Sequence, residues 1–199
     1  MSSQLDLLTL FKAAQSKLSD HQQELNQADE YNHDHGDHMV KIFDLVTNAL
    51  KETSSDDISK GLSKASSLVE GLDSGSAQMY AQGLSQASDY FQDRDFEANE
   101  ILPLLQALLG GGKVKVSKGA GGLLDSLVDS FAGEDGLDMG DILRAGTSFM
   151  EARQRGDSNL EAAVDAIISA SAMGEQPYRA RSSQLVADAL LDNLSKAMK

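Results

Sequence analysis

The residues best suited to chemistry lie in one run near the start of the chain, residues 32–39. The run carries three of the four histidines and two aspartates, and reads Asn32-His33-Asp34-His35-Gly36-Asp37-His38-Met39. Imidazole and carboxylate groups bind divalent cations, and imidazole also exchanges protons near neutral pH. The glycine permits a tight turn or a close approach to a ligand. The run therefore predicts a metal or phosphate site, with a solvated turn between two helices as the alternative.

The carboxylates of this region are the candidate metal ligands. Asp34 and Asp37 belong to the run, and Asp29 lies about one helical turn upstream. The histidines favour a transition metal, or act as proton donors near a phosphate. The N-terminus of the next helix would add N–H donors and a positive dipole end.

The elements that must position this run are helices. Apolar residues recur at intervals of three and four, first along residues 7–28 and again in later stripes at 39–50, 58–72, 79–91, 124–131, 139–149, 160–168 and 186–194. Alternation typical of a strand occurs only in the short segment 113–116. We therefore expect an all-α fold of about eight antiparallel amphipathic helices around one core. A single domain spanning residues 1–199 is the expected organisation.

Capping signals agree with these periods. Ser54 with Asp57, and Ser158 with Glu161, have the spacing of a capping box. Pro103 and Pro177 stand where a helix can begin. The glycine-rich segment 110–122 predicts a linker or a lid, and it does not match the phosphate loop G-x-x-x-x-G-K-S/T.

Composition narrows the class of protein. The chain has no cysteine, which excludes disulfides and cysteine-ligated metals. Its 17 basic and 31 acidic residues give a formal charge of −14, so neither nucleic acid nor an anionic membrane is an expected partner. The sequence has no long apolar stretch and its start lacks the pattern of a signal peptide. We expect a cytoplasmic protein.

The order of residues in the run resembles a family signature. Leu25-Asn26, followed by the D-H-G-D-H-M of residues 34–39, is similar to the L-N and D-G-D-H-G-x-N-M (or D-G-D-T-G-x-N-M) of the dihydroxyacetone kinase L-subunit family, the DAK2 domain. Asp34 falls on the second aspartate of the family's D-x-D. His35, Gly36 and Met39 fall on its H-G and its closing methionine.

Three further segments resemble the same family in the same order. Residues 74–80, S-G-S-A-Q-M-Y, are similar to its phosphate-side loop G-A-S-G-P-L-Y. Residues 119–127, G-A-G-G-L-L-D-S-L, are similar to its nucleotide segment G-D-K-T-M-L-D-A-L, and residues 174–181 resemble its C-terminal G-R-A-S-Y-L-G-E-R. The resemblance assigns the cofactor to the positions Ser74, Gly75, Ser76, Gly119, Gly121 and Gly122.

The resemblance implies a closed barrel of eight helices that binds ADP or ATP at one end. Mg²⁺ would bridge the phosphates and the aspartates, and the phosphoryl group would pass to dihydroxyacetone (glycerone) on a partner K-type subunit. Some members keep ADP as a lasting cofactor that a phosphotransfer protein recharges. The chain could also pair with a second copy of itself as a homodimer.

The chain also departs from the family pattern at the metal site. Asn32 replaces the first aspartate of D-x-D, and Gln27 replaces a further aspartate. A shifted register pairs Asp29 with Asp34 at the family's spacing but loses the H-G-x-N-M match. Residues 120–122, A-G-G, stand where the family has D-K-T. Both registers leave the carboxylate set incomplete.

Two functions follow from these patterns. The first is a glycerone kinase-like phosphotransferase, in which Asp34 with Asp29 or Asp37 holds the metal and His35 and His38 act beside the phosphates. The second is a non-catalytic binding or regulatory module that has lost Mg-ATP chemistry, or holds another divalent metal. A helical domain without a ligand is the third reading.

Overall fold

The computed structural model describes residues 6–53, 57–97, 100–110 and 159–197, and every regular element within them is helical. In chain order the α-helices are α1 (Leu7–Asp20), α2 (Gln22–Ala28), α3 (His35–Glu52), α4 (Ile58–Glu70), α5 (Gly75–Tyr90), α6 (Ile101–Leu109), α9 (Asn159–Ala170) and α10 (Pro177–Ala197). The prediction of an all-helical fold is confirmed for this part of the chain. Segment 113–116 lies outside it. No described helix has both the length and the apolar character that crossing a membrane requires.

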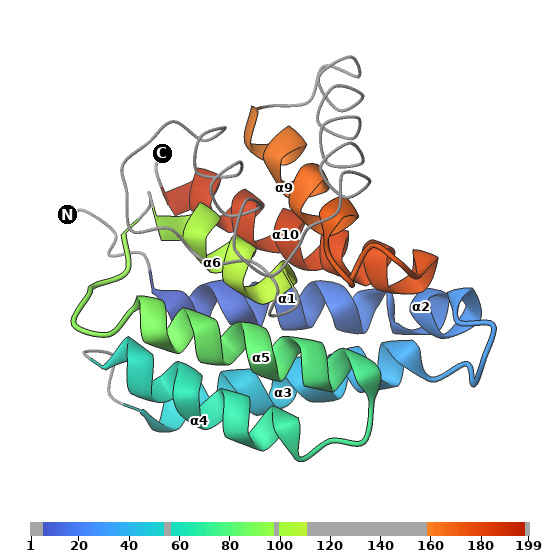
Figure 1. Cartoon of the computed structure of the whole chain (residues 1–199), viewed down its shortest axis with the longest axis horizontal. Coiled ribbons are helices and arrows are strands. Elements are labelled where there is room, and N and C mark those ends of the chain that lie inside the picture. The colour runs from blue at the N-terminus through green and yellow to red at the C-terminus, as the bar shows by residue number, and fades with distance from the viewer. Residues whose placement is uncertain (1–5, 54–56, 98–99, 111–158, 198–199) are drawn as a thin grey trace, which may run out of the picture.

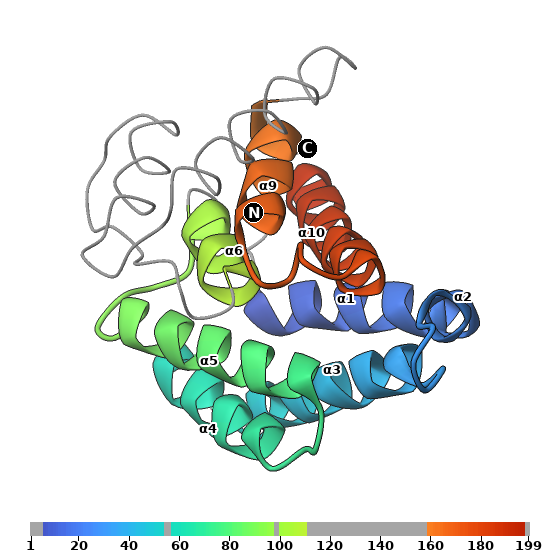
Figure 2. The same ribbon diagram turned by 45° about the vertical axis from the view of Figure 1, so that its right-hand side comes forward.

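Neighbouring helices pack in a circuit. α1 packs on α3, α3 on α4, α4 on α5, α5 on α6, α6 on α9, α9 on α10, and α10 returns to α1. The short helix α2 packs on α3 and α10. Figures 1 and 2 show the result, with α6, α9 and α10 on one side of α1 and with α3, α4 and α5 on the other.

The apolar stripes point into one core. The ring of Phe43 from α3 lies 5.9 Å from that of Phe11 on α1 and 5.4 Å from that of Tyr80 on α5. All three side chains are almost completely buried. Aromatic packing of this kind adds to the free energy gained by burying apolar area, and it fixes α1, α3 and α5 against one another.

Helix starts follow local capping chemistry. The side chains of Asp6, Asp57 and Ser74 accept hydrogen bonds from N–H groups in the first turns of α1, α4 and α5. Pro177 is the first residue of α10 and Pro103 lies in the first turn of α6, as predicted.

One predicted cap is wrong in its register. The capping box placed Asp57 inside the helix, three residues after its cap. In the structure Asp57 is itself the cap of α4, because its carboxylate accepts from the Lys60 N–H at 3.0 Å and pairs with the Lys60 ammonium at 2.8 Å. Ser54 and Ser158 lie outside the described residues.

The stripe predicted along residues 7–28 is broken at His21. The His21 N–H bonds to the carbonyls of Lys17 and Leu18, and its Nδ1 lies 2.8 Å from the Lys17 carbonyl oxygen. The half-buried His21 therefore ends α1 rather than lying in the core. The break allows α2 to lie across the start of α3, where a Cβ on Gly36 would come within 2.1 Å of the Gln22 carbonyl oxygen.

Candidate functional site

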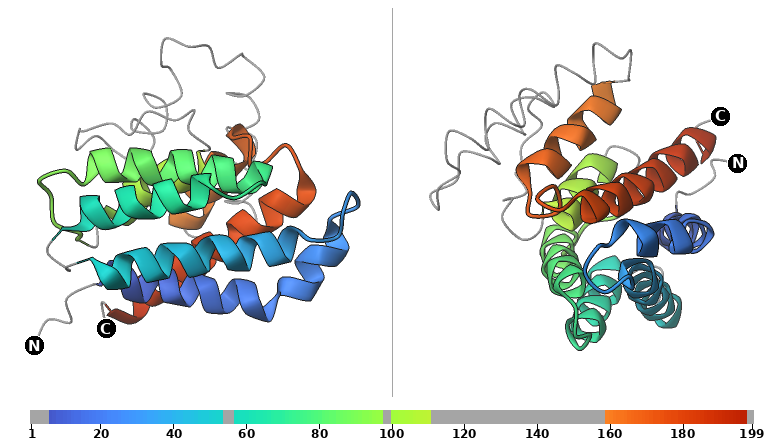
Figure 3. Two further views of the ribbon diagram at one scale, coloured as in Figure 1. Left: turned by 90° about the horizontal axis from the view of Figure 1, so that it is seen from below. Right: turned by 90° about the vertical axis from the view of Figure 1, so that its right-hand side faces the viewer.

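Three helices begin at the same end of the bundle. α3, α5 and α10 start there, at the right of Figure 1, and the right-hand panel of Figure 3 looks onto this end. Their first two turns bring together five side chains, which we call the three-helix end: His35, Ser76, Tyr178, Arg179 and Ser182. Each helix start presents N–H groups without intrahelical partners and the positive end of its dipole.

His35 is the centre of the three-helix end. Its Nε2 lies 2.9 Å from Ser182 Oγ on α10, and its Nδ1 lies 3.5 Å from Ser76 Oγ on α5. Its ring meets the Tyr178 ring edge-on, with 4.7 Å between centroids. Only 3% of His35 is exposed. One imidazole therefore ties α3 to both other helices.

The hydrogen bonds assign the tautomer of His35. Ser182 Oγ donates its proton to the Arg179 carbonyl at 2.9 Å, so it accepts from the imidazole Nε2–H. Nδ1 then remains an acceptor that faces the Ser76 hydroxyl. Burial lowers the pKa of His35 to about 4, opposed by the nearby Asp29 carboxylate and reinforced by Arg179. His35 is therefore neutral near pH 7.

Arg179 lies against the first residue of α5. A Cβ on Gly75 would approach the Arg179 Nη2 to 2.8 Å, so the absence of a side chain at Gly75 admits the guanidinium. The Arg179 Nε is shielded from solvent and has no hydrogen-bond partner among the described residues. The guanidinium carbon lies 5.6 Å from the centre of the Tyr178 ring. By contrast, Arg181 is paired with Glu24.

The three predicted metal ligands each have a partner of their own. The buried Asp29 accepts from the Tyr31 N–H at 3.1 Å. Asp34 Oδ1 lies 3.2 Å from His38 Nδ1. The exposed Asp37 accepts from the side-chain amides of Asn26 and Gln22, and these bonds lower its pKa.

This arrangement does not fit a bound Mg²⁺. Within the part of the chain that the structure describes, no three His, Asp or Glu side chains are grouped so that they could hold a metal ion. Mg²⁺ requires oxygen ligands in near-octahedral geometry at about 2.1 Å. The carboxylates of Asp29 and Asp37 instead accept from N–H groups and side-chain amides. The buried Asp34 Oδ1 lies beside the His38 imidazole without a hydrogen bond among the described residues.

The remaining predicted site residues divide into two groups. The Ser74 hydroxyl caps α5 by accepting from the Ala77 N–H at 3.1 Å, while Gly75 and Ser76 form the start of that helix. His38 is half-buried beside Asp34 and is not among the contacts of His35 described above. Gly119, Gly121 and Gly122 lie outside the described residues.

Ser182 is the one member of the three-helix end that no sequence pattern indicated. Its side chain is 1% exposed and binds His35 across 147 positions of sequence. The only local signal is a pair of serines on the apolar side of α10, Ser182 and Ser183, which are both buried. A buried hydroxyl needs a partner, but sequence alone does not identify it.

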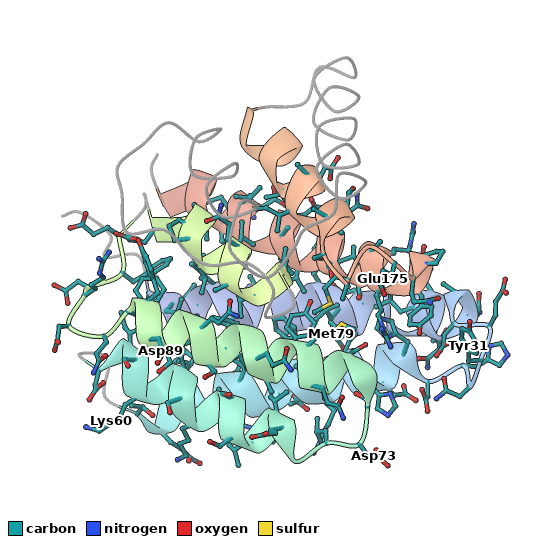
Figure 4. All side chains as sticks on the ribbon, in the orientation of Figure 1. Tyr31, Lys60, Asp73, Met79, Asp89 and Glu175 are labelled. Atoms are coloured by element: carbon teal, nitrogen blue, oxygen red, sulfur yellow. The ribbon has the colours of Figure 1, made fainter. Side chains whose placement is uncertain are left out.

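The rim of this end carries an exposed aromatic side chain. Tyr31, in the turn before α3, is 77% exposed, and its ring meets the Tyr178 ring edge-on at 6.4 Å. Figure 4 shows Tyr31 at the same end of the bundle as Asp73, before α5, and Glu175, before α10. N–H donors, a neutral imidazole and a guanidinium that has no ion pair with any described residue suit an anion better than a cation.

Comparison of the chain with models of known protein families, with curated proteins and with solved structures finds no match.

Proposed function

We propose that the chain is a DAK2-like binding module that holds the phosphate group of ADP or ATP at the three-helix end, without metal-assisted phosphoryl transfer. The contact of His35 with both Ser76 and Ser182 is the observation that carries this proposal. It joins segments 32–39 and 74–80 to the helix that contains most of segment 174–181. These segments bear the resemblance and are far apart in sequence.

The packing circuit supports a closed barrel as the architecture of this module. Seven described helices follow one another around the circuit and the last packs on the first. A barrel closed in this way presents helix ends, rather than helix sides, at its mouth. Helix N-termini are suited to phosphate because their N–H groups and dipoles both favour negative charge.

The state of the carboxylates favours binding over catalysis. Phosphoryl transfer depends on cations that neutralise the developing charge on the phosphate oxygens. In this chain Asn32 stands where the family has a ligating aspartate, and the side-chain amides of Asn26 and Gln22 donate to Asp37. The ligand set that would hold Mg²⁺ is therefore not assembled among the described residues.

An active L-type phosphotransferase is the second candidate function. It is favoured by Asp29, a buried carboxylate whose charge acts on His35. In this reading the phosphoryl group passes to dihydroxyacetone on a K-type partner subunit. His35 and His38 would lie beside the phosphates, and residues 119–122 would complete the nucleotide site.

Two measurements separate these functions. Calorimetric titration of the full chain with ADP and ATP tests binding. The absence of any binding heat at millimolar nucleotide, with or without Mg²⁺, would contradict both proposed functions. Phosphorus NMR of ATP, dihydroxyacetone, Mg²⁺ and a K-type subunit tests transfer. We expect binding without turnover, whereas phosphorylated dihydroxyacetone that disappears in Asp34→Ala would establish the second candidate.

A further inference from the structure

We propose that Arg179 supplies the positive charge that neutralises the bound phosphate, so that this chain binds its ligand without a divalent cation. The inference rests on the proposed phosphate-binding function. It adds to that function the residue that supplies the positive charge, and it states that phosphate binding does not require a metal ion.

The guanidinium of Arg179 lies at the start of α5. Its Nη2 lies at the first residue of α5, within 2.8 Å of the place where a Gly75 Cβ would stand. A side chain at this position would displace the guanidinium from the N–H groups that open α5. A phosphate bound to those N–H groups would therefore meet the guanidinium of Arg179 directly.

The Nε of Arg179 lacks a hydrogen-bond partner among the described residues, although it is shielded from water. Shielding a charged donor without an acceptor is costly. A phosphate oxygen would supply the acceptor, since the planar guanidinium matches phosphate in a two-pronged geometry.

No other member of the three-helix end can supply the positive charge. His35 is neutral near pH 7, and Ser76, Ser182 and Tyr178 carry no positive charge. No group of three described acidic or histidine side chains is able to hold a metal ion. Arg179 is therefore the cation of this set.

A neighbouring arginine provides a matched control. Arg181 lies on the same turn of α10 but forms an ion pair with Glu24 at the surface, with about half of each side chain exposed. Removing the charge of Arg181 changes the net charge by the same amount as removing that of Arg179. Any difference between the two variants thus reports the position of the charge.

The test is calorimetric titration of the full chain with ADP and with inorganic pyrophosphate, once in EDTA and once in Mg²⁺. We expect the wild type to bind both in EDTA. Arg179→Gln should weaken binding about ten- to hundredfold, the usual effect of losing a charged hydrogen bond, and Arg181→Gln less than about threefold. Thermal unfolding of each variant verifies that it folds.

The possible outcomes separate the two proposals. Binding that requires Mg²⁺ or Mn²⁺ overturns the role of Arg179 and leaves the phosphate-binding function standing. No binding in either buffer overturns both. If Arg179→Gln fails to fold, Arg179→Met removes the charge and keeps a side chain of similar length. An affinity loss in EDTA then supports the proposal, and an unchanged affinity contradicts it.

Discussion

The imidazole of His35 and the hydroxyl of Ser182 are joined by a 2.9 Å hydrogen bond that links the first residue of α3 to the second turn of α10. Both groups are buried, and the Ser182 hydroxyl donates a hydrogen bond to the Arg179 carbonyl. The bond therefore positions the residue that we place beside the phosphate. It also fixes the mutual position of two helices that form the mouth of the bundle.

Loss of this bond should cost stability. In Ser182→Ala the buried Nε2–H of His35 loses its hydroxyl acceptor, and we expect the free energy of unfolding to fall by about 1–2 kcal/mol. Urea unfolding followed by circular dichroism measures the change. Ser67→Ala is the control, because the exposed Ser67 hydroxyl bonds only to the Ser63 carbonyl of its own helix. A loss in Ser67→Ala as large as that in Ser182→Ala would contradict the assignment.

Acid should destabilise the fold through His35. Its pKa is about 4 in the fold against 6.5 as the ordinary value, so below pH 6.5 the unfolded chain takes up the proton first. The contribution of His35 to the free energy of unfolding is complete above pH 6.5 and is lost as the pH falls towards 4. Between about pH 7 and about pH 5 the loss attributable to His35 is about 2 kcal/mol.

The corresponding measurement is the free energy of unfolding as a function of pH in wild type and His35→Gln. Carboxylates titrate at the lower end of this range in both proteins, so only the difference between the two curves reports His35. The difference should narrow as the pH falls. Parallel curves would mean that His35 is not neutralised by burial.

The close contact of α2 with α3 makes Gly36 a sensitive position. In Gly36→Ala the new methyl would lie 2.1 Å from the Gln22 carbonyl oxygen and 2.8 Å from Asn26 Oδ1, both on α2. We expect a loss of about 1–3 kcal/mol, larger if α2 is displaced. Gly71→Ala is the control because its methyl meets only the Leu68 carbonyl oxygen at 3.4 Å. Equal melting temperatures for Gly36→Ala and Gly71→Ala would contradict the packing of α2 on α3.

The sequence predicted those features that depend on neighbours in the chain. Apolar spacing identified the helical stripes, and Pro177 marked the start of α10. The break at His21 was not predicted, because an apolar stripe continues through it and only tertiary packing turns α2 onto Gly36. Asp57 was misplaced by three positions because a carboxylate can cap a helix or follow a cap, and both give the same spacing.

The candidate site was predictable in the same limited sense. The family resemblance assigned residues 32–39 and 74–80 to the phosphate end of the barrel, but it gave residues 174–181 no place at that end. The partners of the charged groups were not predictable. Asp37 pairs with Asn26 and Arg181 pairs with Glu24, whereas the Nε of Arg179 has no hydrogen-bond partner in the described part of the chain. These differences depend on which side chains face one another across different helices.

The most direct test of the central claim is an amide NMR titration of the ¹⁵N-labelled full chain with ADP in EDTA. Phosphate bound at the three-helix end should shift the backbone resonances of Gly75 and Ser76, together with those of His35 and Arg179 at the adjoining helix starts. We predict saturable shifts concentrated at these residues and strongly reduced in Arg179→Gln. Shifts confined to other parts of the chain, or none at millimolar ADP, would contradict the account.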